Sequence, residues 1–132
     1  MSIEQLINIG FKKVGEWSFI QDKLLPNLFA EGDVVNVLYC FVVNNEPLYV
    51  GKTTQMLKKR MYGYQNPGKS QFTNIRNNEY IKSTINSGLT VDIYVLPDHG
   101  LLHFGDFHLN LAAGLEDSIT NSIKPKWNIQ GK

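Results

Sequence analysis

The chain has 132 residues, of which 42% are hydrophobic and 19% charged, so it can build one folded core and is too short for two large domains. A single cysteine, Cys40, excludes a disulfide framework and a multi-cysteine zinc module. There is no apolar run of about 18 residues, and the amino-terminal residues do not resemble a signal peptide. We therefore expect a cytoplasmic protein that makes no contact with membranes.

The formal net charge is only +1, but the charge is distributed unevenly along the chain. The segment from Lys52 to Lys82 has a net charge of +6, and the remainder of the chain has a net charge of −5. A basic segment of this kind can form a surface for phosphate groups. The alternative is that these charges only solvate the faces of helices.

The first 33 residues are predicted to be a helical extension that packs on the rest of the domain. Residues 2–13 have helical apolar spacing, and Ser2 and Gln5 have the spacing of a capping box. A second short helix is predicted over residues 24–30, because Pro26 is tolerated in a first helical turn.

Residues 34–132 are predicted to form the main domain. A strand over residues 34–43 and a strand over 48–51 form a hairpin around the turn residues 44–47. Helices follow from Thr53 or Thr54 to about Gly63 and, after a Thr73 cap, over residues 74–87. A third strand over 90–96, a loop over 97–110 and a helix over 111–124 complete the chain. The order β-β-α-α-β-α predicts an α+β fold with a three-stranded antiparallel sheet flanked by helices.

The register of the hairpin decides whether Tyr39 and Tyr49 share a face of the sheet. An even-length turn separates them, whereas an odd-length turn pairs Tyr39 with Gly51 and Phe41 with Tyr49. We prefer the odd register because it gathers one aliphatic face, made of Leu38, Cys40, Val42, Leu48 and Val50. It also leaves the two phenols beside a glycine, over which a substrate backbone could approach closely.

Two familiar motifs are incomplete in this sequence. Gly51-Lys52-Thr53 resembles the end of a phosphate-binding P-loop, but position 46 is Glu rather than the required glycine, so no nucleoside triphosphate site is expected. His99, His103 and His108 lie in one loop without the spacing of zinc ligands. Cys40 lies within an aliphatic strand and is interpreted as a small core residue.

Two helical side chains combine charge with a position near the core. Arg60 is three residues from Leu57 and four from Tyr64, so it points toward the core side and needs an anionic partner, either a phosphate or a structural salt bridge. Glu116 lies at the border of the apolar stripe of the last helix, where a carboxylate is costly unless it is paired. Its partner is either Arg60 or an oxygen-liking metal such as Mg²⁺.

These residues, taken in order, resemble the GIY-YIG nuclease family over residues 36–128. Val37-Leu38-Tyr39 stands at the Gly-Ile-Tyr motif and Tyr49-Val50-Gly51 at the Tyr-Ile-Gly motif. The further matches are Lys52, Arg60, Tyr64, Glu116 and Asn128. We assign Arg60 rather than Lys59, although the interval from Tyr49 is one residue longer than in many members, because Tyr64 then keeps its spacing of four.

The resemblance implies metal-dependent hydrolysis of DNA phosphodiester bonds, with double-stranded DNA as the substrate. Tyr39 would be the general base, its pKa lowered from about 10 by Lys52 and the metal. Glu116 would bind one Mg²⁺ or Mn²⁺ ion per active site, and Arg60 would stabilise the phosphate. Tyr49 and Tyr64 would orient water or phosphate, and Asn128 would support the geometry on the metal side. The basic residues expected to contact the DNA backbone are Lys58, Lys59, Lys69, Arg76 and Lys82.

The preferred subtype is a small restriction-like enzyme that acts as a homodimer when it cuts both strands of a symmetric site. The alternatives are a nucleic-acid-binding module of the same fold without catalysis, and a structural or partner-binding protein. The nuclease hypothesis requires that the two phenols, the guanidinium and the carboxylate converge on one cleft, with Glu116 and the Tyr39 hydroxyl on the same side of the sheet.

Overall fold

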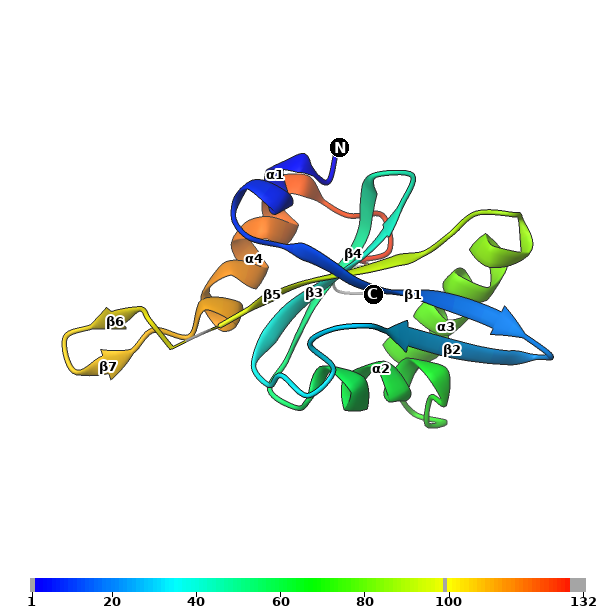
Figure 1. Cartoon of the computed structure of the whole chain (residues 1–132), viewed down its shortest axis with the longest axis horizontal. Coiled ribbons are helices and arrows are strands. Elements are labelled where there is room, and N and C mark those ends of the chain that lie inside the picture. Colours follow the sequence, from blue (N-terminus) through cyan, green and yellow to red (C-terminus); the bar gives the residue numbers. More distant parts are fainter. Residues whose placement is uncertain (1, 99, 129–132) are drawn as a thin grey trace.

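The computed structural model describes residues 2–98 and 100–128, and these form an α+β fold (Figure 1). The strands of the described ranges are β1 (Lys12–Ile20), β2 (Lys23–Leu28), β3 (Val37–Val43), β4 (Glu46–Thr53), β5 (Asp92–Pro97), β6 (His103–Phe104) and β7 (Phe107–His108). The helices are α1 (Glu4–Asn8), α2 (Leu57–Gln65), α3 (Phe72–Asn86) and α4 (Leu111–Ile123). None of these described helices has the length and apolar character needed to cross a bilayer.

The main sheet is antiparallel and has five strands in the order β2-β1-β5-β3-β4. Every residue of β3 is buried, because this strand lies between β4 and β5 and is covered on both faces. β4 is an edge strand, so part of its backbone is open to partners other than a strand. The predicted α+β class is therefore confirmed, whereas the predicted three strands understate the sheet.

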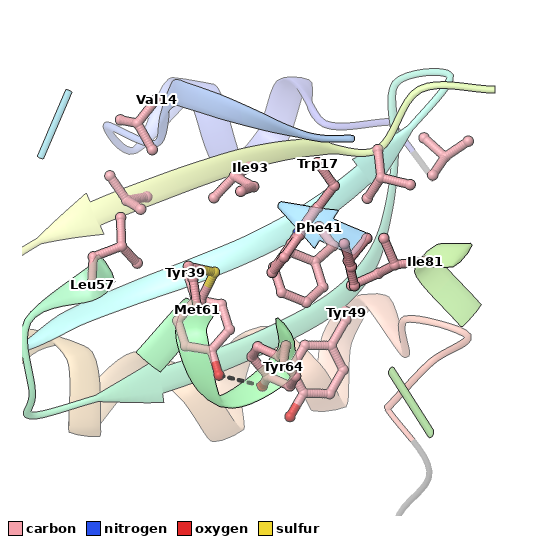
Figure 2. Packing of buried hydrophobic residues seen from close by; sticks show 14 of the residues in the cluster. Val14, Trp17, Tyr39, Phe41, Tyr49, Leu57, Met61, Tyr64, Ile81 and Ile93 are labelled. Atoms are coloured by element: carbon pink, nitrogen blue, oxygen red, sulfur yellow. Dashed lines mark hydrogen bonds between the residues drawn. The ribbon is translucent and has the colours of Figure 1, made fainter. Parts of the chain in front are cut away.

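Alternating side chains divide the interior into two cores, one on each face of the sheet. One core holds Tyr39 and Phe41 of β3 together with side chains from α2 and α3 (Figure 2). The other holds Leu38 and Cys40 of the same strand together with side chains from α1 and α4. The site residues of β3 and those of α4 thus belong to opposite faces of the sheet.

The prediction of two helices within residues 1–33 is largely wrong. A short helix, α1, is present, but Gly10 has a φ of +115° and β1 begins two residues later. The segment predicted as a second helix is β2, an edge strand in which Pro26 pairs with Trp17. Gln21 and Asp22, both with positive φ, form the turn between the strands, a pair of residues without the glycine that normally indicates such a turn. The division of the chain at residue 33 stays a prediction.

The preferred hairpin register is present, with Tyr39 opposite Gly51 and Phe41 opposite Tyr49. Its origin differs from the expected odd-length turn. A two-residue turn at Asn44 and Asn45, both with positive φ, is combined with a register shift after Phe41. Because of this bulge, Leu48 packs against the core that contains Tyr39 rather than on the predicted aliphatic face.

The remaining helices are close to their predicted ranges, but two of the predicted caps are absent. α2 begins at Leu57 and α3 at Phe72, and neither has a side-chain hydrogen bond at its amino-terminal cap. α4 is capped by Asn110, which accepts a hydrogen bond from the Ala113 N–H. The predicted loop over 97–110 contains the small β6–β7 hairpin, which projects from the body of the molecule (Figure 1). His99 lies outside the described residues.

Candidate active site

Three tyrosines from three elements pack together on the α2 side of the sheet. Tyr39 of β3 and Tyr64 of α2 are fully buried, and their hydroxyl oxygens are 2.5 Å apart in a hydrogen bond. The ring of Tyr49 on β4 lies 6.3 Å from each of the other two ring centres. Figure 2 shows the three rings as one cluster with the Tyr39–Tyr64 hydrogen bond at its lower side. The expected phenolic surface is therefore mainly a buried cluster.

Arg60 of α2 lies at the open side of this cluster. Its guanidinium carbon is 4.2 Å from the ring centre of Tyr64, and its Nη2 donates to the Tyr64 hydroxyl at 2.8 Å. Among the described residues no carboxylate lies within 4.0 Å of the guanidinium. The salt bridge to Glu116 that the sequence left open is thus not formed, and the guanidinium retains its capacity to bind an external anion.

Burial sets the protonation of the buried phenols. Loss of solvent raises the pKa of Tyr39 and of Tyr64 well above the ordinary tyrosine value, and the nearby Arg60 charge opposes this increase. The phenols in turn outweigh the effect of burial on Arg60 and raise the pKa of its guanidinium. Both phenols are therefore protonated at neutral pH in the protein alone, and Arg60 is charged.

The space over Gly51 is filled by Tyr39 itself. A Cβ atom at position 51 would lie 2.6 Å from the Tyr39 hydroxyl oxygen and 3.0 Å from Cε2 of Tyr49. The glycine lets the Tyr39 side chain cross its partner strand and reach Tyr64. The sequence indicated that something approaches this glycine closely, but the structure places there the chain's own phenol.

Two amides that the sequence analysis missed connect Arg60 to the start of α3. Nη2 of Arg60 donates to Oδ1 of Asn74 at 3.1 Å, and Nδ2 of Asn74 donates to Oε1 of Gln71 at 3.2 Å. The same Gln71 oxygen accepts the Gly68 N–H at 2.8 Å. The sequence signal for Asn74 was the helical spacing of three asparagines, Asn74, Asn77 and Asn78, which the structure places on the buried face of α3 where apolar residues are normal.

Glu116 reaches the site from the opposite face of the sheet. α4 packs on the core that contains Leu38, yet the Glu116 carboxylate lies beside edge strand β4, where Oε1 is 3.5 Å from Nζ of Lys52. The carboxylate is partly exposed, in agreement with the predicted border position. The expectation of one cleft on one face of the sheet is therefore wrong, because the residues approach the edge of β4 from both sides.

Two hollows lie along this edge. The amide groove, a hollow of about 610 Å³, is lined by Lys52 and Arg60 and by a set of polar side chains that includes Asn36, Gln55, Gln71, Asn74 and Asn110. The carboxylate pocket, of about 230 Å³, is lined by Tyr49, Thr73, Arg76, Glu116, Asp117, Thr120 and Asn128. Lys52 joins them, since it lines the first and pairs with Glu116 of the second. Neither Tyr39 nor Tyr64 lines either hollow.

Asn128 supports the edge strand directly. Its Oδ1 accepts the Val50 N–H and its Nδ2 donates to the Val50 carbonyl, both at 2.8 Å. The side chain thus imitates a neighbouring strand at the residue before Gly51. This contact explains in physical terms why an asparagine near the carboxyl end of the chain lies at the carboxylate pocket.

Asp98 fixes the amino-terminal end of the helix that carries Glu116. Its carboxylate is almost fully buried, accepts the Leu111 N–H at 3.0 Å and the Gly100 N–H at 2.9 Å, and lies 2.9 Å from Nε2 of His108. Burial raises the pKa of this carboxyl, but the two backbone donors and His108 outweigh burial and lower it below its usual value. The same carboxylate accepts a hydrogen bond from Asn36 of the amide groove at 3.2 Å.

The residues of the carboxylate pocket fit a hydrated divalent cation better than a fully liganded one. Within residues 2–98 and 100–128 no group of three or more His, Cys, Asp or Glu side chains is arranged to hold a metal ion. Glu116 and Asp117 nevertheless line one small polar pocket. Mg²⁺ commonly keeps several waters and binds through one or two carboxylates together with substrate phosphate, which is a donor set of this kind.

The basic residues predicted to contact DNA do not share one surface. Arg76 lies at the carboxylate pocket, and Lys69 is exposed in the turn before α3. Lys58 is paired with Asp33 at 2.7 Å, while Lys59 is exposed on α2. Lys82 lies in a separate hollow with Lys23 of β2, and its Nζ is 5.5 Å from the ring centre of Phe19.

Comparison with known proteins identifies related folds but no family. No family model matches the chain, and no curated protein matches it. A bacteriophage T4 EndoII mutant has a TM-score of 0.74 at 20% identity, covering 98% of this chain and 99% of that chain. Restriction endonuclease HPY188I in complex with product DNA has a TM-score of 0.57 at 17% identity, covering 92% of this chain and 79% of that chain. At these identities the likeness establishes a shared fold.

Proposed function

We propose that this chain is a metal-dependent endonuclease that hydrolyses phosphodiester bonds in DNA. The observation that carries the proposal is the charged Arg60 guanidinium, which has no carboxylate partner among the described residues and lies on the same strand edge as the Lys52–Glu116 pair. A phosphodiester is an anion of the size and geometry that a guanidinium binds well. Both structural neighbours are endonucleases by name, one of them with product DNA, which supports DNA as the partner.

Glu116 and Tyr39 lie on opposite faces of the sheet, so the requirement of one shared side is not met, and this proposal replaces it with convergence at the β4 edge. The scissile phosphate lies along that edge, between the two hollows. Arg60 binds a nonbridging oxygen and stabilises the charge that develops during displacement. Glu116 and Asp117 would hold a hydrated Mg²⁺ or Mn²⁺ ion, and that ion would supply Lewis-acid stabilisation of the phosphate and of the leaving oxygen. Tyr49 and Asn128 line the same pocket and orient water or phosphate, and Lys52 adds positive charge.

Tyr39 is proposed as the general base, and burial makes this role conditional on added positive charge. Its pKa is raised in the protein alone, so the hydroxyl accepts a proton only when neighbouring cations lower that pKa. Arg60 lies 5.9 Å from the Tyr39 ring and already acts in this direction. The hydrogen bond between the Tyr39 and Tyr64 hydroxyls connects Tyr39 to the Arg60 guanidinium, which donates to the Tyr64 hydroxyl.

The resemblance to the GIY-YIG family, the restriction-like subtype and the homodimer belong to this proposal. The second candidate is a nucleic-acid-binding module that does not cleave, and the burial of both Tyr39 and Tyr64 away from the two hollows favours it. The two candidates predict the same affinity for DNA and differ in the fate of the phosphodiester bond.

A plasmid assay separates these candidates and is our first prediction. With Mg²⁺, the purified protein should nick supercoiled plasmid, and chelation of the metal should abolish the nicking while DNA binding remains. The Glu116→Ala and Tyr39→Phe variants should each lose at least about a hundredfold of the rate, because each removes a group from the transition state. Strand products on an agarose gel provide the measurement.

The matched control is Asp106→Ala, which changes an exposed carboxylate in the β6–β7 hairpin and should nick at the wild-type rate. If the wild-type protein binds DNA in a salt-sensitive way but does not cleave it, the nuclease proposal is wrong and the binding module is supported. Nicking that survives Glu116→Ala unchanged would remove Glu116 from the proposed site.

A further inference from the structure

The first turn of α3 lies between the two hollows of the candidate site. Gln71 and Asn74 line the amide groove, and Thr73 and Arg76 line the carboxylate pocket. A third hollow of about 420 Å³ is lined by this turn itself and shares those same four residues with its neighbours. Any substrate that spans the β4 edge from one hollow to the other must therefore pass the first turn of α3.

An aromatic side chain projects from this turn. Phe72 is the first residue of α3, lines the third hollow and is 72% exposed. The opposite, buried face of the helix is polar near its start, where Asn74, Asn77 and Asn78 turn inward, and apolar further along at Ile81. The first turns of α3 thus place amides inside and a phenyl ring outside, the reverse of the arrangement that burial of apolar surface favours.

The position of Phe72 is fixed by the backbone that precedes it. Gln71 accepts the Gly68 N–H through its side chain, and its own N–H donates to the Gly68 carbonyl at 3.0 Å. Its side chain also accepts from Asn74, which in turn accepts from Arg60. The ring is therefore presented by a hydrogen-bonded turn that is connected to the proposed phosphate-binding guanidinium.

Cations, rather than other apolar groups, flank the exposed ring. Lys69 is exposed three residues before Phe72, and Arg76 is one helical turn after it on the same side of α3. A single exposed ring between cations differs from the contiguous apolar patch of a protein-binding surface. It is the combination by which proteins stack on bases while neutralising the adjacent phosphates.

We propose that Phe72 is a base-stacking wedge that inserts against an unstacked base beside the phosphodiester that is cut. This inference rests on the proposed function, since it takes DNA as the substrate. Stacking on a phenyl ring is possible for every base, so Phe72 would distort the duplex without itself selecting a sequence. The distortion would bring the backbone toward the narrow edge of β4, where Arg60 and Glu116 approach from opposite faces of the sheet.

The test measures base stacking directly, in metal-free buffer so that no strand is cut. A set of short duplexes is prepared, each with 2-aminopurine at one position, so that the set covers every position. Each duplex is titrated with the full-length protein, and an increase in 2-aminopurine fluorescence reports loss of base stacking. Wild-type protein should increase the fluorescence at one or a few positions. The Phe72→Ala variant should bind about tenfold more weakly and leave the fluorescence at the level of free duplex. Phe72→Tyr, which keeps an aromatic ring, should restore both values.

The control is Phe29→Ala, because Phe29 is 70% exposed and lines none of the three hollows. It should behave as wild type in both measurements. The wedge is overturned if Phe72→Ala matches wild type in affinity and fluorescence, or if wild-type protein binds without any change in fluorescence. In those cases plasmid nicking by wild-type protein would leave the proposed function standing, whereas a wild-type protein that neither binds nor nicks DNA ends both proposals.

Discussion

At the scale of single residues, the most constrained position of the candidate site is Gly51. The Tyr39 hydroxyl crosses over it to reach Tyr64, so the absence of a side chain at position 51 permits the buried phenol pair. The same glycine directly follows Val50, whose backbone is held by Asn128. Geometry at this one position thus joins the phenols on one face of the sheet to the edge that carries the two hollows.

We predict that Gly51→Ala lowers both stability and activity. The new Cβ would lie 2.6 Å from the Tyr39 hydroxyl oxygen and displace that side chain, at a cost of about 1–3 kcal/mol in the free energy of unfolding. Plasmid nicking should fall more than tenfold, because Tyr39 loses its position. Denaturant unfolding and the nicking assay give the two measurements.

The control for this variant is Gly114→Ala in α4, where an added Cβ would meet no atom within 4 Å. It should gain roughly 0.5–1 kcal/mol from helix propensity and keep its nicking rate. If Gly51→Ala were as stable and as active as wild type, Tyr39 could not be confined against position 51.

At the scale of elements, the site depends on an edge strand that is closed by a side chain. β4 pairs with β3 on one side only, and on the other side Asn128 provides a donor and an acceptor to Val50. α4 then brings Glu116 to the same edge, and Asp98 fixes the start of α4 through the Leu111 N–H. The carboxylate pocket is therefore assembled from elements that are far apart in the sequence.

Removal of the Asn128 amide should expose this dependence. Asn128→Ala leaves the Val50 N–H and carbonyl without their partner, and we expect a loss of about 1–2 kcal/mol in the free energy of unfolding, with weaker nicking. Asn121→Ala, an exposed change on α4, should stay within about 0.5 kcal/mol of wild type. Equal stability of the two variants in denaturant unfolding would show that the strand edge does not need this amide.

At the scale of the whole molecule, the fold separates charges that are close in the sequence. The net charge of +6 between Lys52 and Lys82 does not form one patch, because Lys58 pairs with Asp33 and Lys82 lies in the hollow of β2. The cations that remain beside the candidate site are Lys52, Arg60 and Arg76, with Lys69 in the preceding turn. A substrate polyanion is therefore expected along the β4 edge and the first turn of α3.

The salt dependence of DNA binding tests this distribution. The slope of log affinity against log salt concentration becomes shallower by about 0.9 for each phosphate that the protein no longer neutralises. Arg76→Ala should make the slope shallower by about that amount, whereas Lys23→Ala, in the hollow of β2, should leave the slope unchanged. Fluorescence anisotropy over a range of salt concentrations measures both slopes. A shallower slope for Lys23→Ala alone would place the DNA at the hollow of β2 instead of the β4 edge.

The sequence by itself determined the local features of this protein. Side-chain alternation along β3 and β4 predicted the pairing of Tyr39 with Gly51, although a bulge after Phe41 rather than an odd-length turn produces it, and the apolar stripe of α4 placed Glu116 at its border. Helical spacing also brought Arg60 to Tyr64. Each of these follows from the period of one strand or one helix, which a short stretch of sequence contains in full.

The tertiary structure decided everything that depends on contacts between distant segments. β1 joins the sheet by pairing with β5, and Glu116 approaches the edge of β4 from the face opposite to Tyr39, although no local pattern indicates either outcome. The amide partner of Arg60 at Asn74, in place of a carboxylate, likewise depends on how α2 and α3 meet. Strand order and helix docking are set by the total apolar surface that the whole chain buries. No single segment of the sequence determines that total.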